Sequence, residues 1–202
     1  MLQKLKAWAK LMLYRPHGVV MGQGALVRRP WTISHPRYVS IGMRSSIGKG
    51  AILNAIRTHG AQVLAGEITI GADVYIGHGC QIHALQLLRI GDGCVLSDQV
   101  YINDASHGMD PKAGLIMSQP IHSKGPVQLH EHVFIGIGSV ILAGVEIGCH
   151  SVVAAHSVVT RSWPAGSMVA GNPARLIKTL DFSTGRWVRD SSSGATADRG
   201  QQ

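Results

Sequence analysis

Hydrophobic residues return every six positions along much of this chain. From residue 129 the sequence reads LHEHVF, IGIGSV, ILAGVE, IGCHSV, VAAHSV and VTRSWP, and each unit begins with an aliphatic residue. Similar units appear in shifted phase at 41–52, 70–81 and 90–101. A helix needs apolar returns near every 3.6 residues, and a half-buried strand needs them at every second residue. The six-residue period therefore predicts a short strand followed by a turn.

Three such units would form one triangular coil. Stacked coils would pair their strands about 4.8 Å apart and bury a column of aliphatic side chains that no single coil could bury. Glycine in the second slot of many units suits a tight corner. We therefore expect an all-β fold, a parallel β-helix built from hexapeptide repeats, over residues 15–167.

Breaks in the phase of the repeat predict insertions. One lies around 53–69, a short one lies at 83–89, and a long one spans 103–128, beginning within INDASHGMDP. The insertions of a solenoid gather on one face and often form its binding surface. The long insertion is therefore the first place to look for a functional site.

Both ends of the chain leave the repeat. Residues 1–14 place Leu2, Leu5 and Trp8 on one helical stripe and predict a helix packed on the first coil. A basic amphipathic helix contacting a membrane surface is the alternative. Residues 168–182 predict a C-terminal helix after Pro173. The polar, Ser/Gly-rich stretch 183–202 predicts a disordered tail.

The composition fits a narrow, repetitive interior. The 202 residues are 45% apolar but only 5% aromatic, a length that fits one domain. The net charge of +8 favours anionic partners, such as a phosphate-bearing cofactor. The basic residues are scattered, so we do not expect nucleic acid as a partner.

The three cysteines carry no metal-type spacing. Cys80 and Cys94 occupy the same small-residue slot of the repeat, which predicts a packing role, and Cys149 is the third. An odd number of cysteines without a signal peptide predicts reduced thiols and a cytoplasmic location. The sequence has no run of about 20 apolar residues that would predict a membrane span.

Two motifs resemble a known family. The loop sequence HGMDP and the block VFIGIGSVILAGVEIGCHSVVAAHSVVTRSWPAGSMVAGNPARLIK are similar to those of the hexapeptide-repeat O-acetyltransferases. RRPWTISHPRYVSIG at 28–42, D-x-x-H-G at 104–108 and QPI at 119–121 resemble the polysaccharide-biosynthesis branch, the colanic acid acetyltransferase type. The resemblance covers roughly residues 15–180. It implies a left-handed β-helix, a homotrimer, acetyl-CoA as co-substrate and a sugar or glycan acceptor.

The resemblance makes His107 the candidate general base. Acetyl transfer to a hydroxyl needs a base, and histidine, with an unperturbed pKa of about 6.5, can accept that proton near neutral pH. Asp104 would orient the His107 ring, or it would cap a turn; the sequence leaves both open. Backbone N–H groups near Gly136 or Gly138 would stabilise the oxyanion. No Ser or Cys is paired with a base by motif, so we expect direct transfer without an acetyl-enzyme.

The resemblance also implies binding residues. Small residues would let the pantetheine arm lie along the coils, and cations would meet the phosphates of CoA. The implied CoA-binding residues are Gly136, Ile137, Ala155, Thr160, Arg161, Arg175 and Lys178. The acceptor is expected to contact His83, Asp110 and Phe134, and no metal is expected.

Three alternatives remain open. His78 and His83 resemble the paired zinc ligands of the γ-class carbonic anhydrases, but a catalytic zinc there needs a third protein ligand, and His59 and His35 are off register. A non-catalytic β-helix scaffold would show no affinity for CoA. A xenobiotic acetyltransferase would differ mainly in its acceptor loops.

Overall fold

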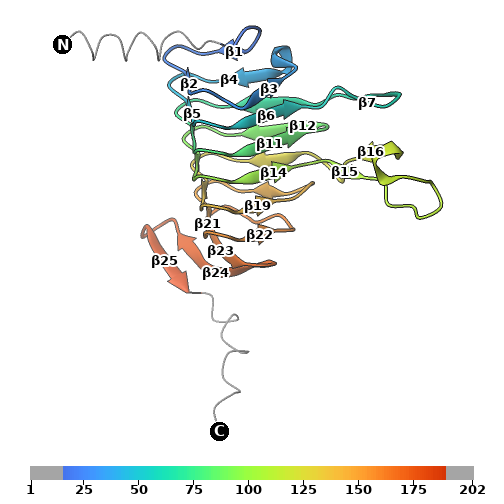
Figure 1. Cartoon of the computed structure of the whole chain (residues 1–202). Helices are drawn as coiled ribbons and strands as arrows, with labels where there is room; N and C mark the ends of the chain where they lie inside the picture. The colour runs from blue at the N-terminus through green and yellow to red at the C-terminus, as the bar shows by residue number, and fades with distance from the viewer. Residues whose placement is uncertain (1–15, 190–202) are drawn as a thin grey trace.

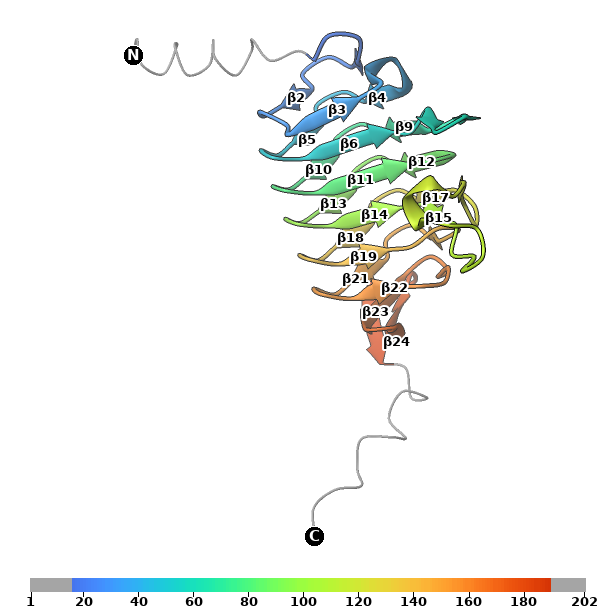
Figure 2. The ribbon, with the colours of Figure 1, turned by 45° about the vertical axis from the view of Figure 1, so that its right-hand side comes forward.

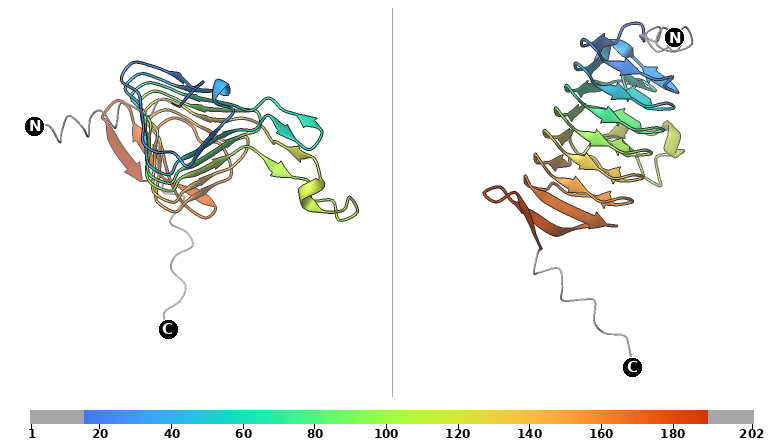
Figure 3. Two further views of the ribbon diagram at one scale, coloured as in Figure 1. Left: turned by 45° about the horizontal axis from the view of Figure 1, so that its top comes forward. Right: turned by 90° about the vertical axis from the view of Figure 1, so that its left-hand side faces the viewer.

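The computed structural model describes residues 16–189, so the predicted helix over 1–14 lies outside the described residues. The described chain winds into a stack of triangular coils, a parallel β-helix (Figure 1). With its top turned toward the viewer, the stack has a triangular outline (Figure 3, left). The predicted all-β solenoid is thereby confirmed. No helix within 16–189 is long and apolar enough to cross a membrane.

Each side of the triangle is one sheet. The first sheet runs β1 (Val20–Met21), β4 (Val39–Ile41), β9 (Glu67–Ile70), β12 (Leu87–Ile90), β17 (Val127–Leu129) and β20 (Glu146–Ile147). The second runs β2 (Leu26–Val27), β5 (Ser46–Ile47), β10 (Tyr75–Ile76), β13 (Val95–Leu96), β18 (Phe134–Ile135), β21 (Val152–Val153), β23 (Ser167–Gly171), β24 (Ala174–Asp181) and β25 (Arg186–Arg189). The third contains β3 (Thr32–Ser34), β6 (Ile52–Ala55), β11 (Gln81–Ala84), β14 (Tyr101–Asn103), β19 (Val140–Ile141) and β22 (Val158–Val159).

The core consists of aliphatic columns, one behind each sheet. In the third sheet, Leu53, Ile82 and Ile102 are paired in register and fully buried. Because side chains alternate across a strand, the residues on either side of each core position point outward. The small slot of the repeat is also buried: Cys80 and Cys94 are fully covered, and burial raises the pKa of each thiol to about 11. Their predicted packing role is confirmed.

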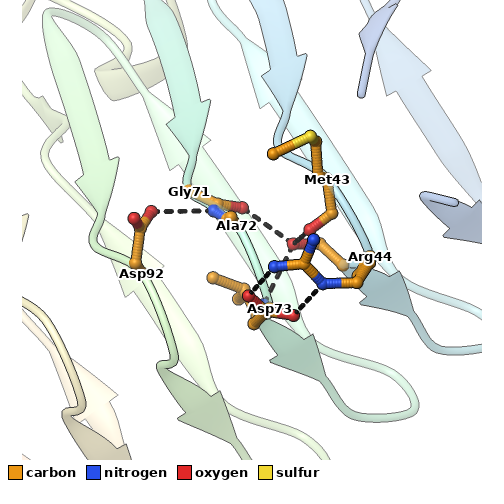
Figure 4. A network of polar contacts seen from close by, with 8 residues as sticks. Met43, Arg44, Gly71, Ala72, Asp73 and Asp92 are labelled. Carbon is orange, nitrogen blue, oxygen red and sulfur yellow. Dashed lines mark hydrogen bonds and ion pairs between the residues drawn. The ribbon is translucent and has the colours of Figure 1, made fainter. Parts of the chain in front are cut away.

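Neighbouring coils are also joined at their corners. Figure 4 shows the corner between the first and second sheets, where Arg44 donates to both carboxylate oxygens of Asp73 on the next coil. One coil further, the carboxylate of Asp92 accepts the backbone N–H of Ala72 at 2.8 Å. These two contacts link three successive coils at one corner.

The predicted insertions all leave the corner between the third and first sheets, which we call the insertion corner. It comprises residues 35–38, 56–66, 85–86, 104–126, 142–145 and 160–162. The first carries the 3-10 helix η1 (Pro36–Tyr38), and the second carries the hairpin β7 (Thr58–His59) and β8 (Gln62–Val63). The longest carries β15 (Ser106–His107), η2 (Ile116–Ser118) and β16 (Ile121–His122). The β7–β8 hairpin and the long loop over 104–126 are the two excursions from the coils, and both extend from the same side of the stack (Figures 1 and 3).

The C-terminal segment is not helical, so the predicted helix over 168–182 is wrong. β23 continues the second sheet on β21, and β24 and β25 then fold back as antiparallel strands. β23 and β24 lie at the lower end of the stack (Figure 2), and Figure 1 shows β25 beside them. Pro173 lies in the turn between β23 and β24 rather than in a first helical turn. The predicted disordered tail over 183–202 is wrong for residues 183–189, which form a turn and β25, and residues 190–202 lie outside the described residues.

Candidate active site

A pocket of about 390 Å³ opens where the two excursions of the insertion corner meet the outer face of the third sheet. Its lining is uncharged apart from the ionisable histidines, and comprises Asn54, Ile56, His59, His83, Tyr101, Asn103, Ala105, Ser106, His107, Met117 and Ile121. The pocket therefore joins residues that lie far apart in the sequence. It places the predicted base His107 and the predicted acceptor residue His83 in one cavity.

The floor of the pocket is a column of outward-facing residues on the third sheet. His83 is in register with Asn54 on one side and Asn103 on the other. The Asn54 amide lies 3.4 Å from His83 Nδ1, and burial lowers the pKa of His83, so this ring is neutral near pH 7. Asn103 donates to the Tyr101 hydroxyl at 2.9 Å. The floor presents amides, a hydroxyl and a neutral imidazole, all suited to bind uncharged polar groups.

His107 lies on β15, which pairs antiparallel with β16 so that His107 is opposite Ile121. Its Nδ1 atom is buried and has no hydrogen-bond partner, and no hydrogen bond to its ring occurs within residues 16–189. The ring of His59 packs against it edge to face, with centroids 5.6 Å apart. A neutral imidazole offers one donor and one acceptor nitrogen. Because Nδ1 is buried, the nitrogen of His107 that can accept a proton from a molecule in the pocket is Nε2.

Asp104 does not orient His107, and that part of the prediction is wrong. The Asp104 side chain is fully buried and accepts the backbone N–H groups of Leu85 and Gln86, the latter at 2.9 Å. Burial raises its pKa, although these backbone donors oppose the rise. The turn-capping alternative is confirmed: Asp104 closes the tight turn of the preceding coil.

Two predicted acceptor residues lie outside the pocket. Asp110 is exposed, and its carboxylate accepts the backbone N–H of Lys112 within the long loop. Phe134 lies on β18 of the second sheet, 41% exposed. No role was predicted for Gln119, the first residue of the QPI motif. Its buried side-chain amide accepts the N–H of Asp110 and donates to the C=O of Asp110, and so supports the loop from inside.

The predicted oxyanion donors are already engaged. The backbone N–H of Gly136 donates to Val153 O at 2.8 Å, and that of Gly138 donates to Asp98 O at 3.0 Å. Both bonds link neighbouring coils, so neither of these two groups is available to a substrate, and an oxyanion donor among the N–H groups near them stays a prediction. Gly136 is glycine for a packing reason: a Cβ there would lie 2.5 Å from the Ala155 nitrogen.

The predicted CoA residues lie at separate places. Gly136, Ile137 and Ala155 form the corner between the second and third sheets, where Ile137 and Ala155 are exposed. Thr160 and Arg161 belong to the insertion corner, below the long loop, and the Arg161 guanidinium lies 4.3 Å from the Trp163 ring centre.

The remaining two cations, Arg175 and Lys178, lie on β24. Arg175 is exposed and donates to the Ala174 carbonyl at 3.1 Å. One chain does not bring the CoA residues into a single cavity with His107.

The zinc alternative receives no geometric support. His78 lies in the corner before β11, where its Nδ1 accepts the Lys49 N–H, while His83 lies on β11 itself, facing the pocket. Within residues 16–189, no three His, Cys, Asp or Glu side chains are grouped as metal ligands.

Known proteins share this repeat. Residues 126–161 match the family model described as bacterial transferase hexapeptide (six repeats). Nodulation protein L of Rhizobium meliloti (strain 1021) is 44% identical over 113 residues, which cover 54% of this chain and 58% of that protein. The Escherichia coli (strain K12) protein named as a lipopolysaccharide biosynthesis O-acetyl transferase, WbbJ, is 26% identical, with 81% of this chain and 83% of that protein covered. The matches to three curated relatives cover only 58%, 54% and 41% of their lengths.

Solved structures share the fold. A mutant of the N-acyltransferase AntD from Bacillus cereus, in a complex with dTDP-4-amino-4,6-dideoxyglucose and coenzyme A, matches with a TM-score of 0.69 at 22% identity, covering 91% of each chain. A maltose O-acetyltransferase from Clostridium difficile 630 matches with a TM-score of 0.53 at 28% identity, covering 70% of each chain. The predicted resemblance to hexapeptide-repeat acetyltransferases is confirmed.

Proposed function

We propose that this chain is an acetyl-CoA-dependent O-acetyltransferase that acts on a hydroxyl of a sugar or polysaccharide precursor. The observation that carries the proposal is the position of His107: its ring lies in an uncharged polar pocket and has no hydrogen bond to any residue in the described range 16–189. The names of two similar proteins, maltose O-acetyltransferase and a lipopolysaccharide biosynthesis O-acetyl transferase, support the reaction type and the acceptor class.

The reaction needs one proton transfer from the acceptor. His107 takes the hydroxyl proton while that oxygen bonds to the acyl carbon of the thioester supplied by acetyl-CoA. The carbon–sulfur bond then breaks, and His107 returns the proton to the departing sulfur. The two coupled steps leave the histidine unchanged, which is the behaviour of a general base that becomes a general acid.

The chain's own residues fit an acyl-CoA. The small, exposed side chain of Ala155 would let a pantetheine arm lie close to the backbone. The guanidinium of Arg161 would pair with phosphate oxygens. Thr160, which precedes Arg161, would also bind CoA. Arg175 and Lys178 add positive charge on β24. Because one chain does not gather these groups around His107, the proposal includes a second copy of the chain that completes the CoA site.

The uncharged lining supports a hydroxyl acceptor over an amine. An amino sugar near neutral pH carries an ammonium group, which a site would stabilise with a carboxylate, and no Asp or Glu lines the described pocket. N-acetylation is the second candidate, because a 62-residue stretch is 53% identical to a tetrahydropyridine-dicarboxylate N-acetyltransferase of Clostridium perfringens. That match covers 26% of the relative.

The test is thiol release from acetyl-CoA with a panel of neutral sugars, amino sugars and nucleotide sugars. His107→Ala should reduce transfer by roughly 10²–10⁴-fold. His122→Ala is the matched control, because His122 lies on the adjacent strand but is exposed and outside the pocket. Retention of most activity by His107→Ala would contradict the base assignment, and a preference for amino sugars would favour N-acetylation.

A further inference from the structure

The hairpin β7–β8 contacts the long loop through three hydrogen bonds across about sixty residues of sequence. Gln62 Nε2 donates to the Ile121 carbonyl at 3.1 Å, and the Ile121 N–H donates to Gln62 Oε1 at 2.8 Å. The ring nitrogen Nε2 of His59 lies 3.1 Å from the Gln119 carbonyl oxygen. The hairpin thus holds two neighbouring points of the loop that carries His107.

The side-chain amide of Gln62 makes the two backbone hydrogen bonds that a further strand would make beside β16. The N–H and C=O of one residue point to the same side of a β-strand, so both groups of Ile121 face the Gln62 amide and turn away from β15. Ile121 is the residue opposite His107 in the β15–β16 pair. The single amide therefore fixes the outer edge of β16, and β16 in turn fixes the position of His107.

His59 acts on His107 more directly. A carbonyl oxygen can only accept a hydrogen bond, so His59 Nε2 carries the proton and its ring orientation is set by Gln119. The edge-to-face contact at 5.6 Å then limits how the His107 ring can turn. This matters because His107 has no hydrogen bond of its own within residues 16–189 to hold its rotamer.

We infer that the hairpin is a positioning element of the active site, with Gln62 and His59 as positioning residues that hold His107 in its reactive orientation. The inference rests on the proposed function, because it assumes that His107 is the base. A displacement of about 1 Å at a catalytic group can cost 10²-fold in rate. Loss of these contacts should therefore slow the reaction without weakening the binding of acetyl-CoA, since neither residue lies among the predicted CoA residues.

The test compares Gln62→Leu with Gln23→Leu. Gln23 is an exposed glutamine in a corner of the first coils, so the same change there controls for the substitution itself. We expect Gln62→Leu to lower kcat about 10- to 100-fold with an unchanged KM for acetyl-CoA, and to accelerate hydrogen exchange of the Ile121 amide. Gln62→Glu, which keeps the shape and one acceptor, is the second variant should Gln62→Leu not fold.

His59 is tested by rescue. His59→Ala should lower kcat, and His59→Gln, which restores an N–H donor toward the Gln119 carbonyl, should recover part of the loss. If the contact only stabilised the fold, His59→Ala would lower the melting temperature but would not lower kcat selectively, with KM unchanged. Equal kcat values for His59→Ala and wild type would overturn the role of His59.

The outcomes separate the two proposals. If His107→Ala abolishes transfer while Gln62→Leu keeps wild-type kcat, the positioning role is overturned and the proposed function stands. Unchanged exchange of the Ile121 amide in Gln62→Leu would overturn the contact itself. If wild type transfers no acetyl group to any acceptor, the proposed function fails, and the catalytic role of the hairpin fails with it.

Discussion

The carboxylate of Asp104 accepts two backbone N–H groups in a fully buried position. Its distance in sequence from His107 suggested a catalytic partner, and only the structure shows that its side chain turns toward Leu85. Motif spacing reports which residues are close along the chain, but not which way a side chain points when a loop leaves a coil. The same limit explains why Gly138 resembled an oxyanion donor although its N–H is bonded to the neighbouring coil.

Asp104 should leave a signature in the pH dependence of stability. Burial raises its pKa above the ordinary value of 3.8 in the folded state. Its contribution to the free energy of unfolding is therefore greatest below that ordinary value and is lost as pH rises through the raised pKa. Relative to Asp104→Asn, wild type should lose stability as pH increases from about 3 to 7.

Urea unfolding of both proteins at several pH values measures this difference. The opposite trend, with wild type gaining on the variant as pH rises, would mean that the backbone donors outweigh burial. Asp104→Asn keeps one acceptor and nearly the same volume, so packing is matched.

At the scale of elements, the coils were predictable because each six-residue repeat forms the same local structure, a short strand followed by a turn. The insertion boundaries were also close to the structure: 53–69 was expected and 56–66 is observed, and 103–128 was expected where 104–126 is observed.

The C-terminal segment was not predictable in this way. The stretch after Pro173 is compatible with a helix or a strand, and pairing with β23 decides for the strand. His59 was set aside as off register for a zinc site, and no local signal indicates its contact with a residue 60 positions later.

Contact between coils should limit substitution at Gly136. An alanine Cβ would lie 2.5 Å from the backbone nitrogen of Ala155, which cannot move away without breaking its own coil. We expect Gly136→Ala to lower the free energy of unfolding by about 2–3 kcal/mol through overpacking. Denaturant unfolding measures the change.

Gly60 provides the comparison. It lies in the β7–β8 hairpin at φ +54°, and nothing lies within 4 Å of the position of a Cβ. Gly60→Ala should cost about 1 kcal/mol from the left-handed backbone alone. Equal losses for the two variants would show that the contact with Ala155 is not what excludes a side chain at Gly136.

For the whole molecule, we expect a homotrimer in solution. The expectation comes from the resemblance to hexapeptide-repeat acetyltransferases. It agrees with the separate positions of the predicted CoA residues, which one chain does not bring together. Size-exclusion chromatography with light scattering should give a mass near three times the 21.5 kDa of the chain. A monomeric mass together with full transfer activity would contradict a shared site. The cytoplasmic location also stays a prediction.

The long loop has a consequence for the folding of the solenoid. Leu88 pairs with Ile68, 20 residues earlier, and with Val127, 39 residues later. Doubling the length of a closed loop adds only about 0.6 kcal/mol of chain entropy. A solenoid can therefore accept an excursion at a corner with little thermodynamic burden, provided that the coils on either side still meet. The insertion corner is thus a site where loops can be exchanged between proteins while the coils keep their register.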